Sequence, residues 1–258
     1  DILVRLAARK EKIYNVIIES TGVADPAPVA QLFINNMQLQ RYFSLDGVIC
    51  VVDAVNFELQ KQQQPETIKQ LVMADLILIN KTDKVTDEQI AIVDDSIRSI
   101  NQTAKRVRST HTQIPINELL KLRAYDLVTM ESTLTTATFF QPTAPVSLVP
   151  TRKPQHAHES AHDIQTFGMR FSGNLDFMKF NVWFNSYVNK CGNNLYRSKG
   201  VITTSTSNKK IIFQSVHHEI DGMEGPDWGN EIRENKMVFI GKNLDEPNLK
   251  ESILNCLA

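Results

Sequence analysis

Long apolar runs are missing from this sequence. No stretch approaches the roughly 20 consecutive apolar residues that a membrane-spanning helix needs, and the start of the chain carries no signal-peptide pattern. A strong charge of either sign is missing too, because 28 Lys and Arg residues stand against 29 Asp and Glu residues. The net charge of −1 gives no broad basic surface for nucleic acid or for an anionic membrane. We therefore expect a cytoplasmic protein that binds neither membranes nor nucleic acid.

Cysteine is also scarce. Cys50, Cys191 and Cys256 are an odd number, and none lies within metal-ligand spacing of another. The sequence therefore predicts no disulfide. Cys50 stands inside a strand-like apolar run at residues 48–52, where a small buried hydrophobe is its expected role.

Apolar segments of strand length alternate with helical segments in the first half of the chain. Strands are expected at residues 13–19, 48–52, 75–80 and 104–109, and helices at 1–12, 25–39, 65–74, 86–100 and 115–122. The clearest helix start is Thr86, because Gln89 three residues later completes a capping box. Strands separated by helices imply right-handed crossovers and a parallel sheet, so this half is predicted to be α/β.

The composition changes at residues 135–163. Thr, Pro, Gln and His are crowded together there, and the prolines interrupt any long element. We interpret this stretch as a linker between a first domain, 1–134, and a second domain, 164–258. In the second domain, strands are expected at 164–171, 199–204, 210–217 and 237–241, and helices at 175–191 and 246–257. This pattern predicts a smaller α+β domain with a mostly antiparallel sheet.

The segment Asn80-Lys81-Thr82-Asp83 has the chemistry to bind guanine. It stands at the carboxyl end of an expected strand, which is where open α/β sheets place their ligand sites. The Asp83 carboxylate can accept hydrogen bonds from the ring N–H and the exocyclic amine of guanine, whereas adenine has no matching donor pair. Asn80 can bond the purine or brace the neighbouring loop, and the stem of Lys81 can lie flat on the base. The alternative is an ordinary exit from a strand into a loop.

Polar residues also stand at the carboxyl end of the strand expected at 13–19. Glu19 closes this apolar run, and Gly22 comes three residues later. In a nucleotide-hydrolysing sheet, a carboxylate at this place holds magnesium or its waters, and the glycine N–H can approach the terminal phosphate. The alternative is a buried strand that leaves the core through a polar turn.

These motifs follow one another in an order that resembles a known family. Three segments carry the resemblance in the first half: Glu19-Ser20-Thr21-Gly22-Val23-Ala24-Asp25-Pro26-Ala27-Pro28-Val29, Val51-Val52-Asp53-Ala54 and Asn80-Lys81-Thr82-Asp83. The combination resembles the CobW-like GTP-dependent metallochaperones, which are P-loop GTPases. Three segments of the second half agree: Lys199-Gly200-Val201, Phe213-Gln214-Ser215-Val216-His217 and Val238-Phe239-Ile240-Gly241-Lys242-Asn243-Leu244-Asp245.

The resemblance implies a fold, ligands and residue roles. It implies a parallel-sheet GTPase-type domain followed by the family's second domain, with GTP and Mg²⁺ as ligands. It further implies that a metal ion, zinc above all, is delivered to a metal-dependent client protein. By the same resemblance Glu19 acts at the magnesium and Gly22 near the γ-phosphate, while Asn80, Lys81 and Asp83 hold the guanine.

Two elements of the family are not found in these 258 residues. The sequence contains no Gly-x-x-x-x-Gly-Lys-Ser/Thr loop, which would wrap the phosphates in backbone N–H groups, and no Cys-x-Cys-Cys metal motif. In the family both precede the helix expected at 1–12. We therefore expect a GTPase-type domain that lacks its amino-terminal part, within a parent protein that is a GTPase. The chain alone is expected to bind GTP poorly and not to hydrolyse it.

Histidines gather in the interpreted linker. His158-Glu159-Ser160-Ala161-His162 matches the His-Glu-x-x-His pattern of zinc proteases, but the proline-containing flanks do not suit a buried helix. We favour a histidine tract, His156, His158 and His162, that collects zinc and passes it on. A solvated linker with incidental histidines stays open as the alternative. His217, at the end of an apolar strand, is expected to be a structural histidine rather than a ligand.

Two other functions remain open. The chain can be a truncated or diverged paralogue that keeps the fold for protein binding and has lost catalysis. An ATP-dependent relative is disfavoured by Asp83, because adenine offers no donor pair to that carboxylate.

Overall fold

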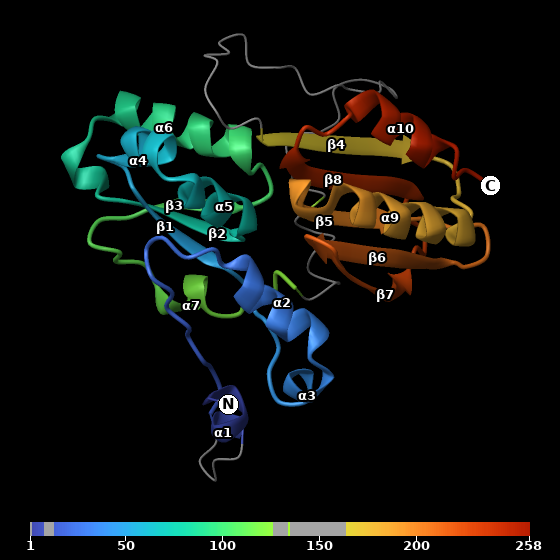
Figure 1. The fold of residues 1–258 in the computed structure, drawn as a ribbon, viewed down its shortest axis with the longest axis horizontal. Helices are drawn as coiled ribbons and strands as arrows, with labels where there is room; N and C mark the ends of the chain where they lie inside the picture. Colours follow the sequence, from blue (N-terminus) through green and yellow to red (C-terminus); the bar gives the residue numbers. More distant parts are fainter. Residues whose placement is uncertain (1, 8–12, 126–133, 135–163) are drawn as a thin grey trace.

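Two β-sheets organise the chain. The structure is a computed structural model that describes residues 2–7, 13–125, 134 and 164–258. The first half forms a parallel sheet in the order β1-β2-β3, and the second half forms an antiparallel sheet in the order β4-β8-β5-β6-β7 (Figure 1). The strands are β1 (Ile49–Asp53), β2 (Leu76–Asn80), β3 (Lys105–Arg108), β4 (Ile164–Ser172), β5 (Leu195–Ile202), β6 (Lys209–Val216), β7 (Glu219–Asp227) and β8 (Glu234–Lys242). The predicted α/β half and α+β half are confirmed.

The central strand of the parallel sheet, β2, is buried on both faces. Leu76, Ile77, Leu78 and Ile79 are at most 3% exposed. Such continuous burial is typical of parallel strands, whose two faces are both covered. The helices that follow β1 in this half include α4 (Phe57–Gln63), α5 (Pro65–Met73), α6 (Asp87–Ile100) and α7 (Ile116–Leu119). Helix α6 begins at the predicted capping box, with both reciprocal hydrogen bonds between Thr86 and Gln89.

The edge strand β1 is packed on one face only. Cys50 and Val52 are buried in the core cluster that includes Phe57 of α4, whereas Ile49 and Val51 are 40% and 55% exposed. Alternate residues of a strand point to opposite faces, so one face of β1 is open. The expected role of Cys50 as a small buried hydrophobe is confirmed.

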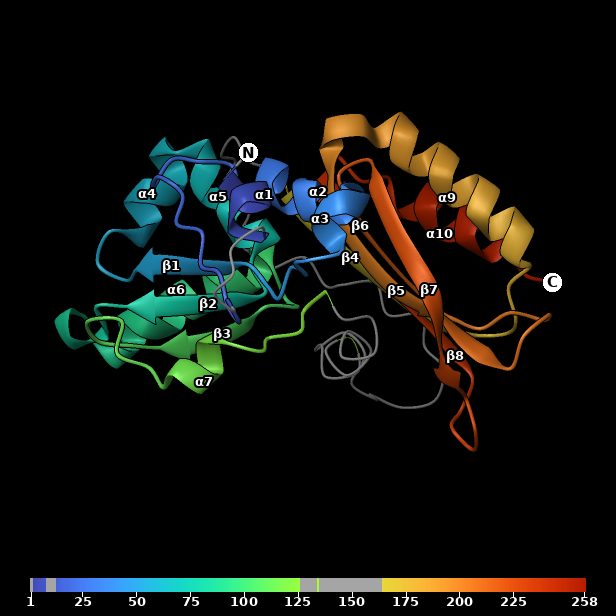
Figure 2. The ribbon, with the colours of Figure 1, turned by 90° about the horizontal axis from the view of Figure 1, so that it is seen from below.

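The antiparallel sheet lies under two helices, α9 (Phe177–Cys191) and α10 (Glu246–Leu254), which cover the same face (Figure 2). The alternation along β8 shows how both faces are used. Phe239 packs with the aromatic residues of α9, whereas Val238 and Ile240 join the core cluster of the first half. The second sheet is therefore sandwiched between its own helices and the first half of the chain. None of the helices in the described part of the chain is long and apolar enough to cross a bilayer.

Buried charges join the two halves. Asp75, which precedes β2, pairs with Arg197 of β5 at 2.5 Å and with Lys199 of the same strand at 3.2 Å. The second oxygen of Asp75 accepts a hydrogen bond from Val48 N at 3.0 Å, and Arg197 donates to Met73 O at 2.8 Å. Burial raises the pKa of Asp75, but the two cations outweigh it and hold this pKa below its ordinary value.

One expected strand is wrong. Residues 13–20 form no strand, and the apolar side chains among them are exposed, with Ile17 at 77% and Ile18 at 48%. A strand exists only where a neighbour completes its backbone hydrogen bonds, and the strands of the described chain pair elsewhere, β1 with β2 alone. The apolar run at residues 13–19 therefore has the residue types of a strand, but no neighbouring strand pairs with it in the described chain.

The helix expected at 25–39 and strand β7 differ from expectation. The helix expected at 25–39 is split into α2 (Ala27–Asn35) and α3 (Met37–Gln40), because the Asn36 side chain accepts hydrogen bonds from Gln38 N and Leu39 N and so caps a new helix. The helix expected at 1–12 is seen as α1 (Ile2–Ala7). Strand β7 was not expected, since its sequence contains Gly222, Gly225 and Pro226.

Candidate nucleotide site

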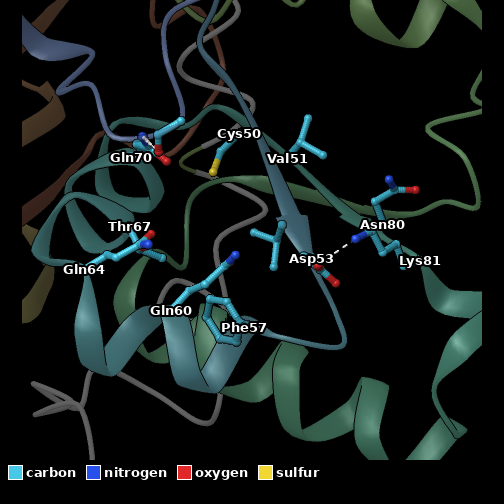
Figure 3. Close-up of a pocket in the computed structure, with 12 residues that line it drawn as sticks. Cys50, Val51, Asp53, Phe57, Gln60, Gln64, Thr67, Gln70, Asn80 and Lys81 are labelled. Carbon is cyan, nitrogen blue, oxygen red and sulfur yellow. Dashed lines mark hydrogen bonds and ion pairs between the residues drawn. The ribbon is translucent and has the colours of Figure 1, made fainter.

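The carboxyl ends of β1 and β2 lie next to each other and open onto a pocket. Asp53 pairs in register with Asn80, so the residues after both strands meet at the same edge of the sheet. The pocket has a volume of about 260 Å³ and lies between this edge and helices α4 and α5 (Figure 3). It is lined by Gly22, Cys50, Val51, Val52, Asp53, Phe57, Gln60, Gln64, Thr67, Gln70, Asn80 and Lys81. Three of the predicted site residues, Gly22, Asn80 and Lys81, are thus brought together.

Lys81 is held in an unusual conformation by an ion pair. Its φ of 63° lies in the left-handed region, which costs a non-glycine residue about 1 kcal/mol or more. Its Nζ lies 2.8 Å from Asp53 Oδ2. The side chain therefore reaches back across the edge of the sheet to β1, rather than lying flat as a platform for a base.

Asp53 is a fixed part of this pair. Its Oδ1 accepts a hydrogen bond from Val55 N at 3.0 Å, and its Oδ2 accepts one from Asn56 Nδ2 at 2.9 Å. Burial raises the pKa of the Asp53 carboxyl, but the hydrogen bonds from Lys81, Asn56 and Val55 together hold it below its ordinary value. Asp53 is consequently an anion whose oxygens are engaged by protein donors.

Asn80 braces the loop that follows β3. Its Oδ1 accepts hydrogen bonds from Thr112 N at 2.9 Å and from Ser109 Oγ at 3.3 Å. His111 and Thr112 both have φ of 52°, and two successive non-glycine residues in the left-handed region indicate a loop held in place by its surroundings. Of the two roles considered for Asn80, the structure shows the bracing one.

This loop was missed from the sequence. Ser109-Thr110-His111-Thr112 follows β3 at the same edge of the sheet as Asp53 and Asn80, and Thr82 Oγ1 donates to Ser109 O at 3.0 Å. The signal that could have found it is a cluster of hydroxyl residues at the carboxyl end of a third parallel strand.

Gly22 reaches the pocket through a loop that is attached to α5. Gln70 Nε2 donates to Gly22 O at 3.0 Å and to Ala24 O at 2.9 Å. A methyl group placed on Gly22 would meet no atom within 4 Å, so the space beside this residue is open. Glu19 is exposed and is not among the residues that line the pocket. Asp83 is exposed in the 3-10 turn Thr82–Lys84 and also lies outside the lining.

The predicted zinc residues His156, His158 and His162 lie outside the described residues. Within the described ranges, no group of three or more His, Cys, Asp or Glu side chains is placed to hold a metal ion. His217 is partly buried against Tyr196, at 5.5 Å between ring centroids, and burial lowers its pKa. Its Nδ1 is buried without a hydrogen-bond partner among the described residues, so the structural role stays a prediction.

The sequence matches two family models that together cover most of the chain. Residues 2–108 match the CobW/HypB/UreG nucleotide-binding domain, and residues 164–257 match the cobalamin synthesis protein cobW C-terminal domain. The chain belongs to the CobW family. In this CobW-family chain, the pocket and the Asn80–Asp83 segment both fall within the nucleotide-binding match.

Similar proteins carry related descriptions. The zinc-regulated GTPase metalloprotein activator 1 of Schizosaccharomyces pombe is 34% identical over 125 residues, which are 48% of this chain and 30% of that protein. The zinc chaperone YjiA of Escherichia coli is 26% identical over 250 residues, covering 97% of this chain and 73% of that protein. The crystal structure of Zn(II)-bound YjiA GTPase from E. coli superposes with a TM-score of 0.72 at 23% identity, over 92% of this chain and 69% of that one. This superposition confirms the fold.

The residues present fit the base end of GTP better than its phosphate end. The braced loop, Asn80 and the exposed Asp83 carboxylate surround one edge of the sheet, and carboxylate and amide groups suit the donor and acceptor pattern of guanine. At the phosphate end, a Cβ on Gly22 would meet no atom within 4 Å, and Glu19, which lies outside the pocket lining, is an exposed carboxylate of the type that binds magnesium. Asp53 is less suited to a metal, because Lys81 and Asn56 already engage its oxygens.

Proposed function

We propose that this chain functions in a GTP-dependent zinc metallochaperone, in which its Asn80–Asp83 segment binds the guanine base. The activity of such a protein is hydrolysis of GTP coupled to delivery of zinc to a metal-dependent client protein. The match to the nucleotide-binding family model supports the nucleotide, and the descriptions of the relatives support zinc. The predicted domain limits, 1–134, 135–163 and 164–258, are part of this proposal.

One observation carries the proposal. The Asn80-Lys81-Thr82-Asp83 segment follows the carboxyl end of the buried central strand, and its residues Asn80 and Lys81 line a pocket together with Gly22. Asn80 Oδ1 accepts hydrogen bonds from Ser109 Oγ and Thr112 N, so the chain's own contacts fix the loop at this end of the site. Bound GTP supplies the phosphoanhydride whose hydrolysis drives the cycle, with Mg²⁺ as its counter-ion.

Guanine recognition is tested by exchanging one side chain. Asp83→Asn replaces one carboxylate oxygen by an amide donor, which faces the guanine donors unfavourably. Fluorescent GDP and ADP titrations of the wild-type chain and of the variant measure the preference directly. We expect the wild-type chain to prefer GDP and Asp83→Asn to reduce that preference about tenfold or more. An unchanged ratio of GDP to ADP affinity would remove Asp83 from the site.

A second function, a binding module without catalysis, is favoured by a specific observation. The 258 residues contain no Gly-x-x-x-x-Gly-Lys-Ser/Thr segment, and such a loop provides much of the transition-state stabilisation for phosphoryl transfer. We expect no GTP turnover by this chain above that of a Glu19→Ala variant. Phosphate release in the presence of Mg²⁺ measures it, and turnover that depends on Glu19 would favour the enzyme over the module.

The zinc part of the proposal is tested on the histidines. The triple variant His156→Ala, His158→Ala and His162→Ala is expected to lose at least one zinc equivalent by calorimetric titration, since imidazoles bind Zn²⁺ well. A Lys105→Ala variant serves as a control, because it changes an exposed ion pair with Glu118 and no metal-binding side chain. Equal zinc binding by all three proteins would assign the tract to a solvated linker.

A further inference from the structure

The side chain of Gln70 connects two parts of the chain that are far apart in sequence. Gln70 lies in the last turn of α5. Its amide nitrogen donates hydrogen bonds to two backbone carbonyls, Gly22 O at 3.0 Å and Ala24 O at 2.9 Å. The two carbonyls belong to the loop that contains Gly22 and Ala24. Because one planar amide bonds both of them, it fixes the distance of this loop from α5 and the orientation of the loop relative to α5.

The loop is exposed over residues 13–22. A hydrogen bond from Ala24 N to Thr21 O at 2.9 Å closes a turn within it. The neighbouring residue Lys69 pairs with Asp25 at 3.2 Å, in a surface position where ion pairs contribute little. The Gln70 amide therefore provides two directional contacts between the loop and the body of the first half.

The hydrogen bonds from Gln70 also determine the position of Gly22 relative to the pocket. Gly22 and Gln70 both line the pocket, and a Cβ on Gly22 would meet no atom within 4 Å. We propose that Gln70 is a positioning residue that holds the Gly22 loop at the pocket, so that the Gly22 N–H meets the terminal phosphate of a nucleoside triphosphate. This role rests on the proposed function, because it concerns the phosphate end of the same nucleotide site.

The positioning is tested first without nucleotide. Gln70→Ala removes the amide, and Gln70→Glu keeps its size but offers no donor to the two carbonyls. Gln63→Ala is the matched control, since Gln63 is an exposed glutamine at the end of the adjacent helix α4. Backbone ¹⁵N relaxation is expected to show Gly22 and Ala24 ordered in the wild-type chain and in Gln63→Ala, and flexible in both Gln70 variants, with β2 unchanged in all four.

The second measurement compares two nucleotides. Both Gln70 variants are expected to bind GTPγS about tenfold more weakly than the wild-type chain, with GDP affinity unchanged, because GDP has no terminal phosphate for Gly22 to meet. A merely structural glutamine would lower both affinities together or neither.

The outcomes separate the two proposals. A wild-type chain that binds neither nucleotide overturns the proposed function, while the relaxation data still decide whether Gln70 positions the loop. Ordered Gly22 and Ala24 in Gln70→Ala overturn the positioning. The positioning role is also overturned if Gly22 and Ala24 stay ordered in Gln70→Glu but not in Gln70→Ala. In that case packing of the side chain, rather than hydrogen-bond donation, would hold the loop. Equal loss of GTPγS and GDP affinity overturns the link to the terminal phosphate.

Discussion

The thiol of Cys50 illustrates what burial does to a single group beside the pocket. The residue is 7% exposed, and burial raises its pKa to about 12. Only the thiolate is a good nucleophile and metal ligand, so Cys50 is a poor candidate for both roles at neutral pH. Its contribution to the site is the shape of the pocket wall.

The rate of alkylation measures how far burial lowers the reactivity of the Cys50 thiol. In the native chain at pH 8, we expect Cys50 to react with iodoacetamide at least about tenfold more slowly than it does in urea, because both the access and the thiolate fraction are low. Mass spectrometry of the digested protein assigns each modified cysteine. Cys191, which is partly exposed, is the internal comparison. Equal reaction of Cys50 in the native and the unfolded chain would contradict its burial.

At the scale of elements, one buried asparagine joins α5, α6 and β3. Asn101 is completely buried, and its amide nitrogen donates to Leu71 O at 2.8 Å and Ala74 O at 2.9 Å. Its oxygen accepts from Thr103 N and Ala104 N, each at 3.0 Å. The carbonyls at the end of α5 and the N–H groups of the turn before β3 are thus satisfied by a single side chain.

Asn101→Ala removes the side-chain partner of five backbone groups that are buried or part-buried. We expect it to lower the free energy of unfolding by about 3 kcal/mol, measured by urea denaturation. Ser99→Ala, at an exposed position of α6, is the control and is expected to change stability by about 0.5 kcal/mol or less. A loss for Asn101→Ala no larger than that of the control would mean that water replaces the missing bonds.

Elements with a local cause were predictable. The apolar run of β2 and the capping box of α6 lie within a few residues of sequence, and both are where they were expected. Strand β7 was not predictable, because its glycines are required by its neighbour: a Cβ on Gly225 would come within 2.7 Å of Ile212 Cδ1. The strand expected at 13–19 failed for the opposite reason, since its sequence suits a strand but no partner accompanies it in the described chain.

The candidate site also has a part that was predictable from the sequence and a part that was not. The Asn80–Asp83 segment and Gly22 were found from short patterns, because each stands at the end of an apolar run. The Lys81–Asp53 ion pair and the Gln70 contact join residues 28 and 48 positions apart, and no local pattern indicates either. Contacts of this kind follow from the packing of helices on the sheet, which the sequence alone leaves undetermined.

At the scale of the whole molecule, the buried charges between Asp75 and β5 hold the two halves together. Lys199 is 3% exposed and is the weaker base of the two cations there. Burial, reinforced by the neighbouring Arg197, lowers the pKa of Lys199 to about 8, although Asp75 opposes the shift. The proton on Lys199 therefore leaves the folded chain more readily than the unfolded chain.

This difference makes stability depend on pH. Above pH 8 the folded chain releases the Lys199 proton, whereas the unfolded chain keeps it to about pH 10.4, so the free energy of unfolding gains a positive slope in that window. Between pH 7.5 and 9.5 we expect the Lys199 contribution to rise by about 2 kcal/mol. Urea denaturation of the wild-type chain and Lys199→Met measures it as the difference between the two slopes. Parallel slopes would show that Lys199 keeps an ordinary pKa.

The open face and free edge of β1 also affect how the chain behaves in solution. Ile49 and Val51 are exposed on a strand that pairs on one side only within the described structure, and Ile17 and Ile18 add apolar surface. Such an edge favours pairing between molecules. We expect sedimentation velocity to show concentration-dependent self-association that Val51→Lys reduces, with Ile92→Lys on exposed α6 as the control. Equal association of all three would place the contact elsewhere. If Val51→Lys alone reduces self-association, one strand edge rather than the nearly neutral net charge sets the solubility and shelf life of this chain.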